Sequence, residues 1–193
     1  QSLIDQEDVM VKILVRDDGS SDKTLEILRN WEIMGCIQYY QGENLGPSLS
    51  FMDLIQNAPN ADYYAFCDQD DVWHKDKLAI AVKKLSMTKS NKPSLYFSSA
   101  KLVDKDLNFI GYSNLNPVYN LPGILLGSNA IGCTMVFNKE LLDIIKFNIP
   151  KKSILHDAWT IRACLVIDGE VIFDGTPHID YRQHENNVVG AIN

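Results

Sequence analysis

Residues 63–71 read Tyr-Tyr-Ala-Phe-Cys-Asp-Gln-Asp-Asp, an apolar run that ends abruptly in carboxylates. The apolar part predicts a buried strand over Tyr63–Cys67. Side chains two apart in an extended segment share a face, so Asp68 and Asp70 can reach one cation. Such oxygen ligands suit Mg²⁺ or Mn²⁺, and ligands of open α/β sheets bind just past the carboxyl ends of strands. The stretch therefore predicts a metal that holds a diphosphate, with a plain loop and helix cap as the alternative.

The sequence around this stretch alternates between strand and helix patterns, which is typical of α/β folds. Ahead of it we expect strands at Val9–Val15 and Cys36–Tyr40, a helix marked by Leu25–Trp31, and a helix from Gly46-Pro47 to Pro59. Behind it a helix is expected at Leu78–Leu85. The second half predicts strands at Leu95–Lys101, Leu107–Tyr112, Ile131–Phe137, Val171–Phe173 and His178–Tyr181, and helices at Asn138–Lys146 and His156–Ile167.

The composition argues against several classes of protein. A net charge of -7 and a pI near 5.0 disfavour a nucleic-acid binder, which would carry a clustered basic surface. The cysteines are far apart and lie in apolar sequence, which predicts buried thiols in a reducing compartment: Cys36, Cys67, Cys133 and Cys164. No apolar run approaches the roughly 18 residues of a membrane span. We expect a cytoplasmic protein without a transmembrane segment, and peripheral association with the inner face of a membrane stays open.

Several motifs, in this order along nearly the whole chain, resemble family-two glycosyltransferases of the GT-A fold, and most of all rhamnosyltransferase-like bacterial members. They are Val15–Asp22 (VRDDGSSD), Asn44–Gly46 (NLG), Asp68–Trp73 (DQDDVW), His156–Trp159 (HDAW) and Tyr181–Gly190 (YRQHENNVVG). The resemblance implies a Rossmann-like α/β fold: a mixed, mostly parallel central sheet flanked by helices, with a small second sheet toward the acceptor side. It also implies one catalytic domain over 1–193, with a nucleotide-binding half at 1–100 and an acceptor and catalytic half at 101–193.

The resemblance further implies an activity. We expect a metal-dependent, inverting glycosyltransferase that uses Mg²⁺ or Mn²⁺ and moves a sugar, with rhamnose favoured, from a dTDP- or UDP-linked donor. The acceptor would be a hydroxyl of a glycan or lipid-linked saccharide in cell-surface polysaccharide synthesis. Two alternatives stay open: a sugar-phosphate nucleotidyltransferase, and a truncated, non-catalytic module that binds nucleotide sugars.

The same resemblance assigns residues to the donor and the metal. Asp17, with Asp18 beside it, is expected to accept a hydrogen bond from the pyrimidine ring; the alternative is a plain turn with Gly19 at positive φ. Asp70 is the expected metal ligand, and Asp68 lies near metal or ribose. Gly132 belongs to a segment where a missing side chain lets backbone approach the transferred sugar.

Asp157 is the expected base that deprotonates the acceptor hydroxyl. The alternative is an ordinary acid in the first turn of a helix, where the helix dipole favours a carboxylate. His184 and Arg182 are candidates for contact with metal and diphosphate, although such side chains are often structural. His156 and Trp159 are acceptor-side candidates, with simple packing as the alternative.

Members of this family normally begin with a strand and a helix ahead of the strand at Val11. Gln1–Gln6 resembles the tail of that helix. We therefore expect the first strand to be absent from these 193 residues, which would leave unpaired backbone beside neighbouring strands.

Overall fold

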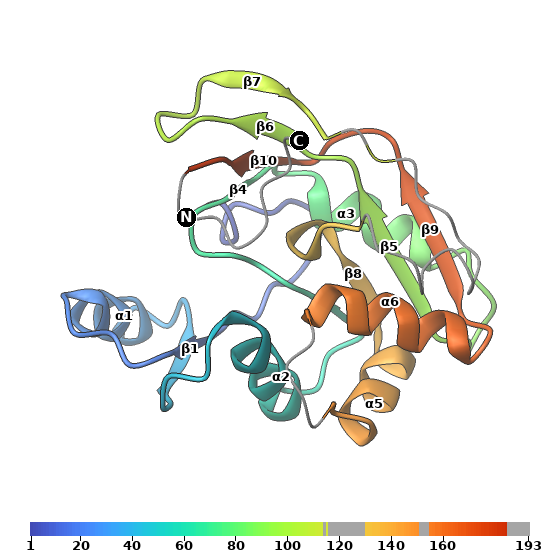
Figure 1. Cartoon of the computed structure of the whole chain (residues 1–193), viewed down its shortest axis with the longest axis horizontal. Helices are drawn as coiled ribbons and strands as arrows, with labels where there is room; N and C mark the ends of the chain where they lie inside the picture. Colours follow the sequence, from blue (N-terminus) through green and yellow to red (C-terminus); the bar gives the residue numbers. More distant parts are fainter. Residues whose placement is uncertain (114, 116–129, 151–154, 185–193) are drawn as a thin grey trace.

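The computed structural model of the chain describes residues 1–113, 115, 130–150 and 155–184 (Figure 1). Its elements are β1 (Leu14–Asp17), α1 (Thr24–Ile33), β2 (Gln38–Gln41), α2 (Pro47–Asn57), β3 (Tyr63–Ala65), β4 (Val72–Trp73), α3 (Lys77–Leu85), β5 (Ser94–Ser98), β6 (Lys101–Val103), β7 (Phe109–Tyr112), the 3₁₀ turn η1 (Gly132–Thr134), β8 (Val136–Asn138), α5 (Lys139–Phe147), α6 (His156–Val166), β9 (Glu170–Asp174) and β10 (Ile179–Arg182).

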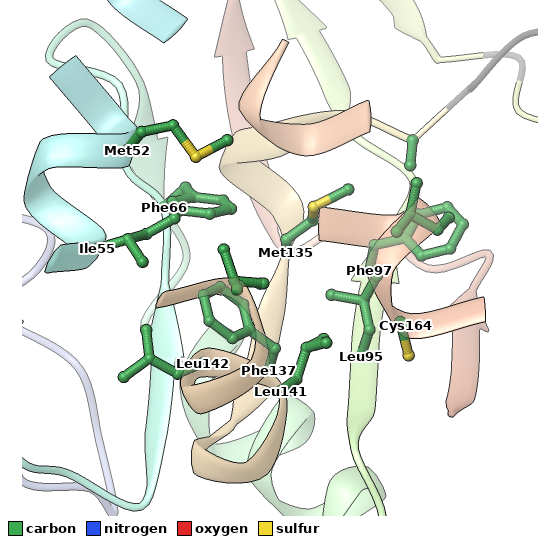
Figure 2. Packing of buried hydrophobic residues seen from close by; sticks show 13 residues of the cluster. Met52, Ile55, Phe66, Leu95, Phe97, Met135, Phe137, Leu141, Leu142 and Cys164 are labelled. Carbon is green, nitrogen blue, oxygen red and sulfur yellow. The ribbon is translucent and has the colours of Figure 1, made fainter. Parts of the chain in front are cut away.

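The main sheet has the strand order β3-β8-β5-β9 and lies between two layers of helix. Side chains alternate along β5, so that Leu95 and Phe97 pack with α5 and α6, whereas Tyr96 packs with α3 on the other face. All five residues of β5 are buried, as expected of a strand covered on both faces. Figure 2 shows the larger cluster, in which Phe137 of β8 meets Leu141 and Leu142 of α5.

A second sheet with the order β4-β10-β6-β7 follows where the chain leaves β5, and β1 and β2 form a separate parallel pair. Among the described strands three pairs are parallel and four are antiparallel. The predicted mixed α/β architecture and its small second sheet are therefore confirmed, although parallel pairing does not predominate among these strands. No helix in the described ranges is long and apolar enough to cross a membrane.

A cavity of about 580 Å³ separates β1 from β3. One wall is the segment Val9–Leu14, which leads into β1, and the opposite wall is Tyr63–Cys67. Within the described residues, β1 pairs with β2 alone and β3 with β8 alone. The main sheet and the β1–β2 pair are thus adjacent without being joined by strand hydrogen bonds.

The predicted helices are confirmed, whereas several strands differ from expectation. The strand expected at Val9–Val15 begins only at Leu14, because pairing with β2 starts there. The strand expected at Ile131–Phe137 is a 3₁₀ turn followed by β8. The strand expected at Leu95–Lys101 is divided into β5 and β6, which belong to different sheets. Residues Gln1–Gln6 form turns, with one helical hydrogen bond from Asp5 N to Gln1 O. All four cysteines are free thiols, as predicted, but only Cys133 and Cys164 are buried, whereas Cys36 and Cys67 are partly exposed.

Candidate active site

The acidic loop after β3 brings its carboxylates into a half-buried cluster. Burial raises the pKa of the Asp68 carboxyl to about 7, and repulsion from Asp71 and then Asp70 adds to the shift. Asp157, which is far away in sequence, contributes to the same shift. The predicted metal ligands and the predicted base therefore lie in one electrostatic site.

Asp71 is buried more deeply than its position in an acidic run suggested. Its Oδ1 accepts a hydrogen bond from Arg182 N at 3.0 Å. The Cys133 thiol lies beside this carboxylate, and Asp71 Oδ2 has no hydrogen-bond partner among the described residues. Burial raises the pKa of the Asp71 carboxyl to about 6, against the opposing effects of Cys133 and the Arg182 amide.

β10 brings Arg182 and His184 to the acidic loop. His184 Nε2 lies 2.7 Å from Asp70 Oδ2, and Arg182 Nε donates to Asp70 O at 2.8 Å. The guanidinium of Arg182 also donates to the carbonyl oxygen of Lys105, in the β6–β7 turn. Arg182 and His184 thus lie beside the acidic loop, with the Arg182 side chain bonded to backbone. Of the motif Tyr181–Gly190, residues 185–190 lie outside the described residues.

Asp157 begins α6, and Gly132 lies directly against it. Asp157 Oδ1 accepts a hydrogen bond from Ala158 N at 2.5 Å. Burial raises the pKa of the Asp157 carboxyl, against the effect of hydrogen bonds from the Ala158 and Gly132 amides. A Cβ on Gly132 would lie 2.6 Å from His156 Nε2 and 3.3 Å from Asp157 Cβ, so only glycine fits.

The two acceptor-side candidates, His156 and Trp159, are packed against the core. The His156 ring stacks on Phe51 with centroids 4.0 Å apart and meets Phe66 edge-on at 4.7 Å. Burial lowers the pKa of the His156 imidazole to about 4, so the ring is neutral at physiological pH. Its ring nitrogens, like the Trp159 indole nitrogen, have no hydrogen-bond partner among the described residues. This geometry favours the packing alternative.

Asp17, the last residue of β1, and Asp18, which follows it, lie in different environments. Asp17 is 4 % exposed, and its Oδ2 accepts from Gly19 N at 3.2 Å and from Ser20 N at 3.1 Å. Gly19 has a φ of +89°, as predicted for this turn. The Asp18 carboxylate instead accepts from Leu45 N, Gly46 N and Ser50 Oγ at 2.8–3.0 Å and from the Arg16 guanidinium. The Asp17 carboxylate therefore stabilises the turn that follows β1, and the Asp18 carboxylate links this turn to the start of α2.

The donor set fits a hard divalent cation. Oxygen atoms of Asp68 and Asp71 and the Cys133 sulfur lie within 4.8 Å of one another. Burial raises the pKa of the Cys133 thiol well above its ordinary value, so this sulfur stays protonated and is a poor ligand. The remaining donors are the carboxylate oxygens of Asp68 and Asp71, which are the kind of ligand that Mg²⁺ and Mn²⁺ prefer. Of these, Asp71 Oδ2 has no hydrogen-bond partner among the described residues. Sequence reasoning missed Asp71 and Cys133 here; the only signal was their adjacency to Asp70 and Gly132.

Comparisons of sequence place the chain among known proteins. Residues 1–143 match the family described as Glycosyl transferase family 2. The dTDP-rhamnosyl transferase RfbG of Shigella flexneri is 32% identical over 213 aligned residues, which cover 99% of this chain and 69% of that protein. The putative teichuronic acid biosynthesis glycosyltransferase TuaG of Bacillus subtilis is 30% identical over 107 residues, 54% of this chain and 41% of that protein.

Comparison of structures agrees. S. aureus TarS 1-349 in complex with UDP matches 94% of this chain with a TM-score of 0.69 at 20% identity, and the match spans 54% of the TarS chain. GalNAc-T7 with UDP, GalNAc and Mn²⁺ matches 91% of this chain with a TM-score of 0.59 at 10% identity, over 38% of its own length. These likenesses show the fold shared with GT-A enzymes. By sequence and by fold, the chain belongs to glycosyl transferase family 2 and carries a glycosyltransferase domain.

Proposed function

We propose that this protein is a metal-dependent, inverting glycosyltransferase that moves a sugar, with rhamnose favoured, from a dTDP- or UDP-linked donor to a hydroxyl of a glycan or lipid-linked saccharide. One observation carries the proposal: the carboxylate of Asp157 acts electrostatically on Asp68, so the candidate base and the candidate metal ligands lie near one another. The RfbG relative, named as a dTDP-rhamnosyl transferase, supports the choice of donor.

On the donor side, each residue has a separate task. Asp17 accepts from the pyrimidine ring through the oxygen that its turn does not use. Asp70 and Asp68, with the Asp71 carboxylate close to Asp68, would hold Mg²⁺ or Mn²⁺, which would supply positive charge to offset that of a departing nucleoside diphosphate. His184 orients Asp70 through their 2.7 Å contact, and Arg182 fixes the loop through its bonds to backbone. Gly132 lets backbone come close to the sugar.

Asp157 takes the proton of the acceptor hydroxyl as that oxygen attacks the anomeric carbon from the face opposite the diphosphate. Its raised pKa makes it a stronger base than an exposed carboxylate, which offsets the acidifying effect of the helix N-terminus. His156 and Trp159 hold the start of α6 in place by packing, so they shape the acceptor side indirectly.

The proposal treats the chain as one catalytic domain, with nucleotide binding in 1–100 and the acceptor and base in 101–193. Pairing between strands of the two halves, β3 with β8 and β4 with β10, supports a single unit. We also propose that the protein works at the cytoplasmic face of a membrane in polysaccharide synthesis. The name of the TuaG relative, which gives teichuronic acid biosynthesis, supports polysaccharide synthesis.

Calorimetric titration with dTDP and UDP, with and without Mn²⁺, tests the donor site. We expect Mn²⁺-dependent binding that Asp70→Ala abolishes and that Asp106→Asn, an exposed acid in the β6–β7 turn, leaves intact. Binding that is equal with and without Mn²⁺ would contradict the metal-dependent mechanism.

Asp157→Asn tests the chemistry. We expect release of dTDP from dTDP-rhamnose in the presence of acceptor to fall by about 10²–10⁴-fold, the usual contribution of a general base, with dTDP binding unchanged. Full activity of Asp157→Asn would remove the base from the mechanism. Mn²⁺-dependent binding in a wild-type chain that transfers nothing to a range of acceptors would favour a binding module.

A further inference from the structure

Arg16 has a buried side chain near the carboxyl end of β1, and the proposed reaction gives it no task. This side chain is 3% exposed, and all three guanidinium nitrogens donate hydrogen bonds. Nε donates to Asp53 Oδ2 at 2.8 Å, and one terminal nitrogen donates to Ser50 Oγ at 3.1 Å and to the Asp18 carboxylate. The other terminal nitrogen donates to Glu43 O at 2.8 Å. One side chain therefore bonds to the turn after β1, to the segment after β2 and to α2.

The segment after β2, residues 42–46, is fastened to the turn after β1 at several points. Gly42 N donates to Asp17 O at 2.9 Å. Two further backbone amides of the segment donate to the Asp18 carboxylate, each at 3.0 Å. A carbonyl oxygen of the same segment accepts from Arg16. The turn that contains Asp17 and the 42–46 segment thus form one hydrogen-bonded unit, which the side chains of Asp18 and Arg16 hold together.

Gly42 is matched to Arg16 by shape. A Cβ at position 42 would collide with the Arg16 guanidinium. The φ of Gly42 lies outside the left-handed region, so its backbone conformation does not itself call for glycine. The close approach of the arginine does. The position of the guanidinium therefore depends on the absence of a side chain at residue 42.

The chemistry of the guanidinium favours a role in geometry over one in stability. Replacing a buried ion pair by apolar side chains of similar volume is often neutral or stabilising, so such pairs are weak evidence for a stabilising role. A guanidinium, by contrast, presents its donors in a rigid plane and can hold several acceptors at set positions at once. Arg16 does so for acceptors of three separate segments, directly beside Asp17.

We propose that Arg16 is the positioning residue of the base site: its guanidinium holds Asp18 and the 42–46 segment against the turn of Asp17, so that the Asp17 carboxylate is in place before a nucleotide arrives. The role rests on the proposed function in taking Asp17 as the group that accepts from the pyrimidine ring. It goes beyond that function because it makes the choice of nucleobase depend on a side chain that touches no ligand. A site ordered in advance avoids the entropic cost of ordering its loops on binding.

Calorimetric titration with dTDP and with ADP, both in the presence of Mn²⁺, tests this role, because the two nucleotides share a diphosphate and differ in the base. We expect the wild type to prefer dTDP and Arg16→Met to lose most of that preference. The Kd for dTDP should rise about tenfold, roughly the effect of one lost hydrogen bond to a charged group, and the Kd for ADP should change by less than about twofold. Arg29→Met, at an exposed arginine of α1, is the matched control and should keep the wild-type preference.

Arg16→Lys separates positioning from charge balance. Its ammonium still offsets the charges of Asp18 and Asp53, but a single nitrogen cannot hold acceptors of three segments in place. We expect the Tm of Arg16→Lys to be closer to the wild-type value than that of Arg16→Met, while the preference for dTDP stays lost. If the preference returns together with the Tm, Arg16 acts only through its charge and the positioning role is overturned.

Gly42→Ala reaches the same contact without removing a hydrogen-bonding group, and it decides the question if Arg16→Met does not fold. We expect the added methyl group to displace the guanidinium and to reduce the preference for dTDP as Arg16→Met does. Combining both substitutions should add no further loss, because they act through one contact. A wild-type preference in Gly42→Ala would overturn the role of Arg16.

The two proposals fail in different ways. A wild-type chain that binds dTDP and ADP equally would refute Asp17 as the residue that reads the base, and the role of Arg16 with it. A wild-type chain that prefers dTDP, together with an Arg16→Met variant that prefers it equally, would overturn the role of Arg16 alone.

Discussion

The β1–β2 layer (β1, α1 and β2) and the main sheet β3-β8-β5-β9 are built from similar strand and helix units but are stabilised differently. α1 buries no residue completely, whereas every residue of β5 is buried. The main sheet has apolar clusters on both faces. Hydrophobic burial therefore stabilises the side of the site that holds the acidic loop and Asp157 far more than the side that holds Asp17.

A polar network takes the place of a core in the β1–β2 layer. Arg16, whose side chain is 3% exposed, donates to Asp53 at 2.8 Å, to Ser50 at 3.1 Å and to Asp18. Tyr40 of β2 donates to the same Asp53 carboxylate at 2.7 Å. The Arg16–Asp53 ion pair thus links β1 to α2, and the Tyr40 hydrogen bond to Asp53 joins β2 to them. The difference teaches that the two sides of one active site can be sensitive to different perturbations.

The largest expected effect is on the main sheet. Phe137→Ala removes a ring that is 1% exposed, and we expect it to lower the free energy of unfolding by about 3–5 kcal/mol, measured by urea denaturation. Phe147→Ala, at a ring that is 90% exposed at the end of α5, is the matched control and should stay within about 0.5 kcal/mol. Equal effects of the two substitutions would mean that the apolar cluster does not stabilise this sheet.

Arg16→Met tests the polar network of the other region. It leaves two partly buried carboxylates without their cation, and we expect a cost of about 1–3 kcal/mol. Hydrogen exchange should speed up at β1 and β2 amides and stay unchanged at β5, and dTDP binding should weaken. Arg29→Met, on the exposed side of α1, is the control. Equal loss of protection in β5 would show that the two regions unfold as one.

The acidic loop and Asp174 should give opposite pH dependences. Burial raises the pKa of Asp68 to about 7, so ionisation costs stability as pH rises from about 4 to 7. Burial also acts to raise the pKa of Asp174, but hydrogen bonds from Lys84 and Thr176 prevail and lower it to about 2. The stability that Asp174 contributes is therefore complete above about pH 4 and is lost as pH falls through 2.

The measurement is the metal-free Tm, followed below pH 4 for Asp174 and between pH 4.5 and 8 for the acidic loop. We expect the wild type to lose stability on the order of 2 kcal/mol across this range, and Asp68→Asn to lose less. Mn²⁺ should reduce the wild-type loss, because it favours the ionised carboxylates. An identical slope in Asp68→Asn would assign the pH dependence to another group.

The smallest expected effect compares two isoleucines on helices of the two regions. Ile33 in α1 is 76% exposed, whereas Ile145 in α5 is 0% exposed. Ile145→Val should cost about 0.5–1.5 kcal/mol, and Ile33→Val should be close to neutral. A cost for Ile33→Val similar to that for Ile145→Val would indicate that α1 is covered in solution.

Sequence periodicity predicted the helices well and the strand limits less well. α5 follows from apolar spacing and from Asn138, whose side chain accepts from Leu141 N at 3.2 Å as a cap. α6 was predicted as well, although its apolar residues do not gather on one face. The turn at Gly132–Thr134 was predicted as a strand, because β-branched and apolar residues flank it. The close approach of His156 to Gly132 depends on tertiary packing and is not visible in the local sequence. Strand limits depend on which strand lies alongside, and that information is absent from local sequence.

Only part of the candidate site was predicted, again because local sequence does not show which side chains pack together in the fold. The motifs gave Asp68, Asp70 and Asp157 as candidates, and the structure brings their segments together. The depth of Asp71 and the burial of Lys77 depend on Trp73, Cys133 and other side chains that pack across the fold. Periodicity gives the face of a helix on which a lysine lies, but not that an apolar cluster encloses it.

The cavity between β1 and β3 also has a consequence for how the protein behaves at high concentration. Strand backbone that has no strand partner among the described residues can pair with a strand of a neighbouring molecule, and apolar walls such as those formed by Leu14 and Phe66 favour such contacts. Repulsion arising from a net charge of -7 acts against association at low salt and is screened as ionic strength rises. Colloidal stability of the purified chain should therefore decrease with added salt, and storage at low ionic strength should limit its self-association.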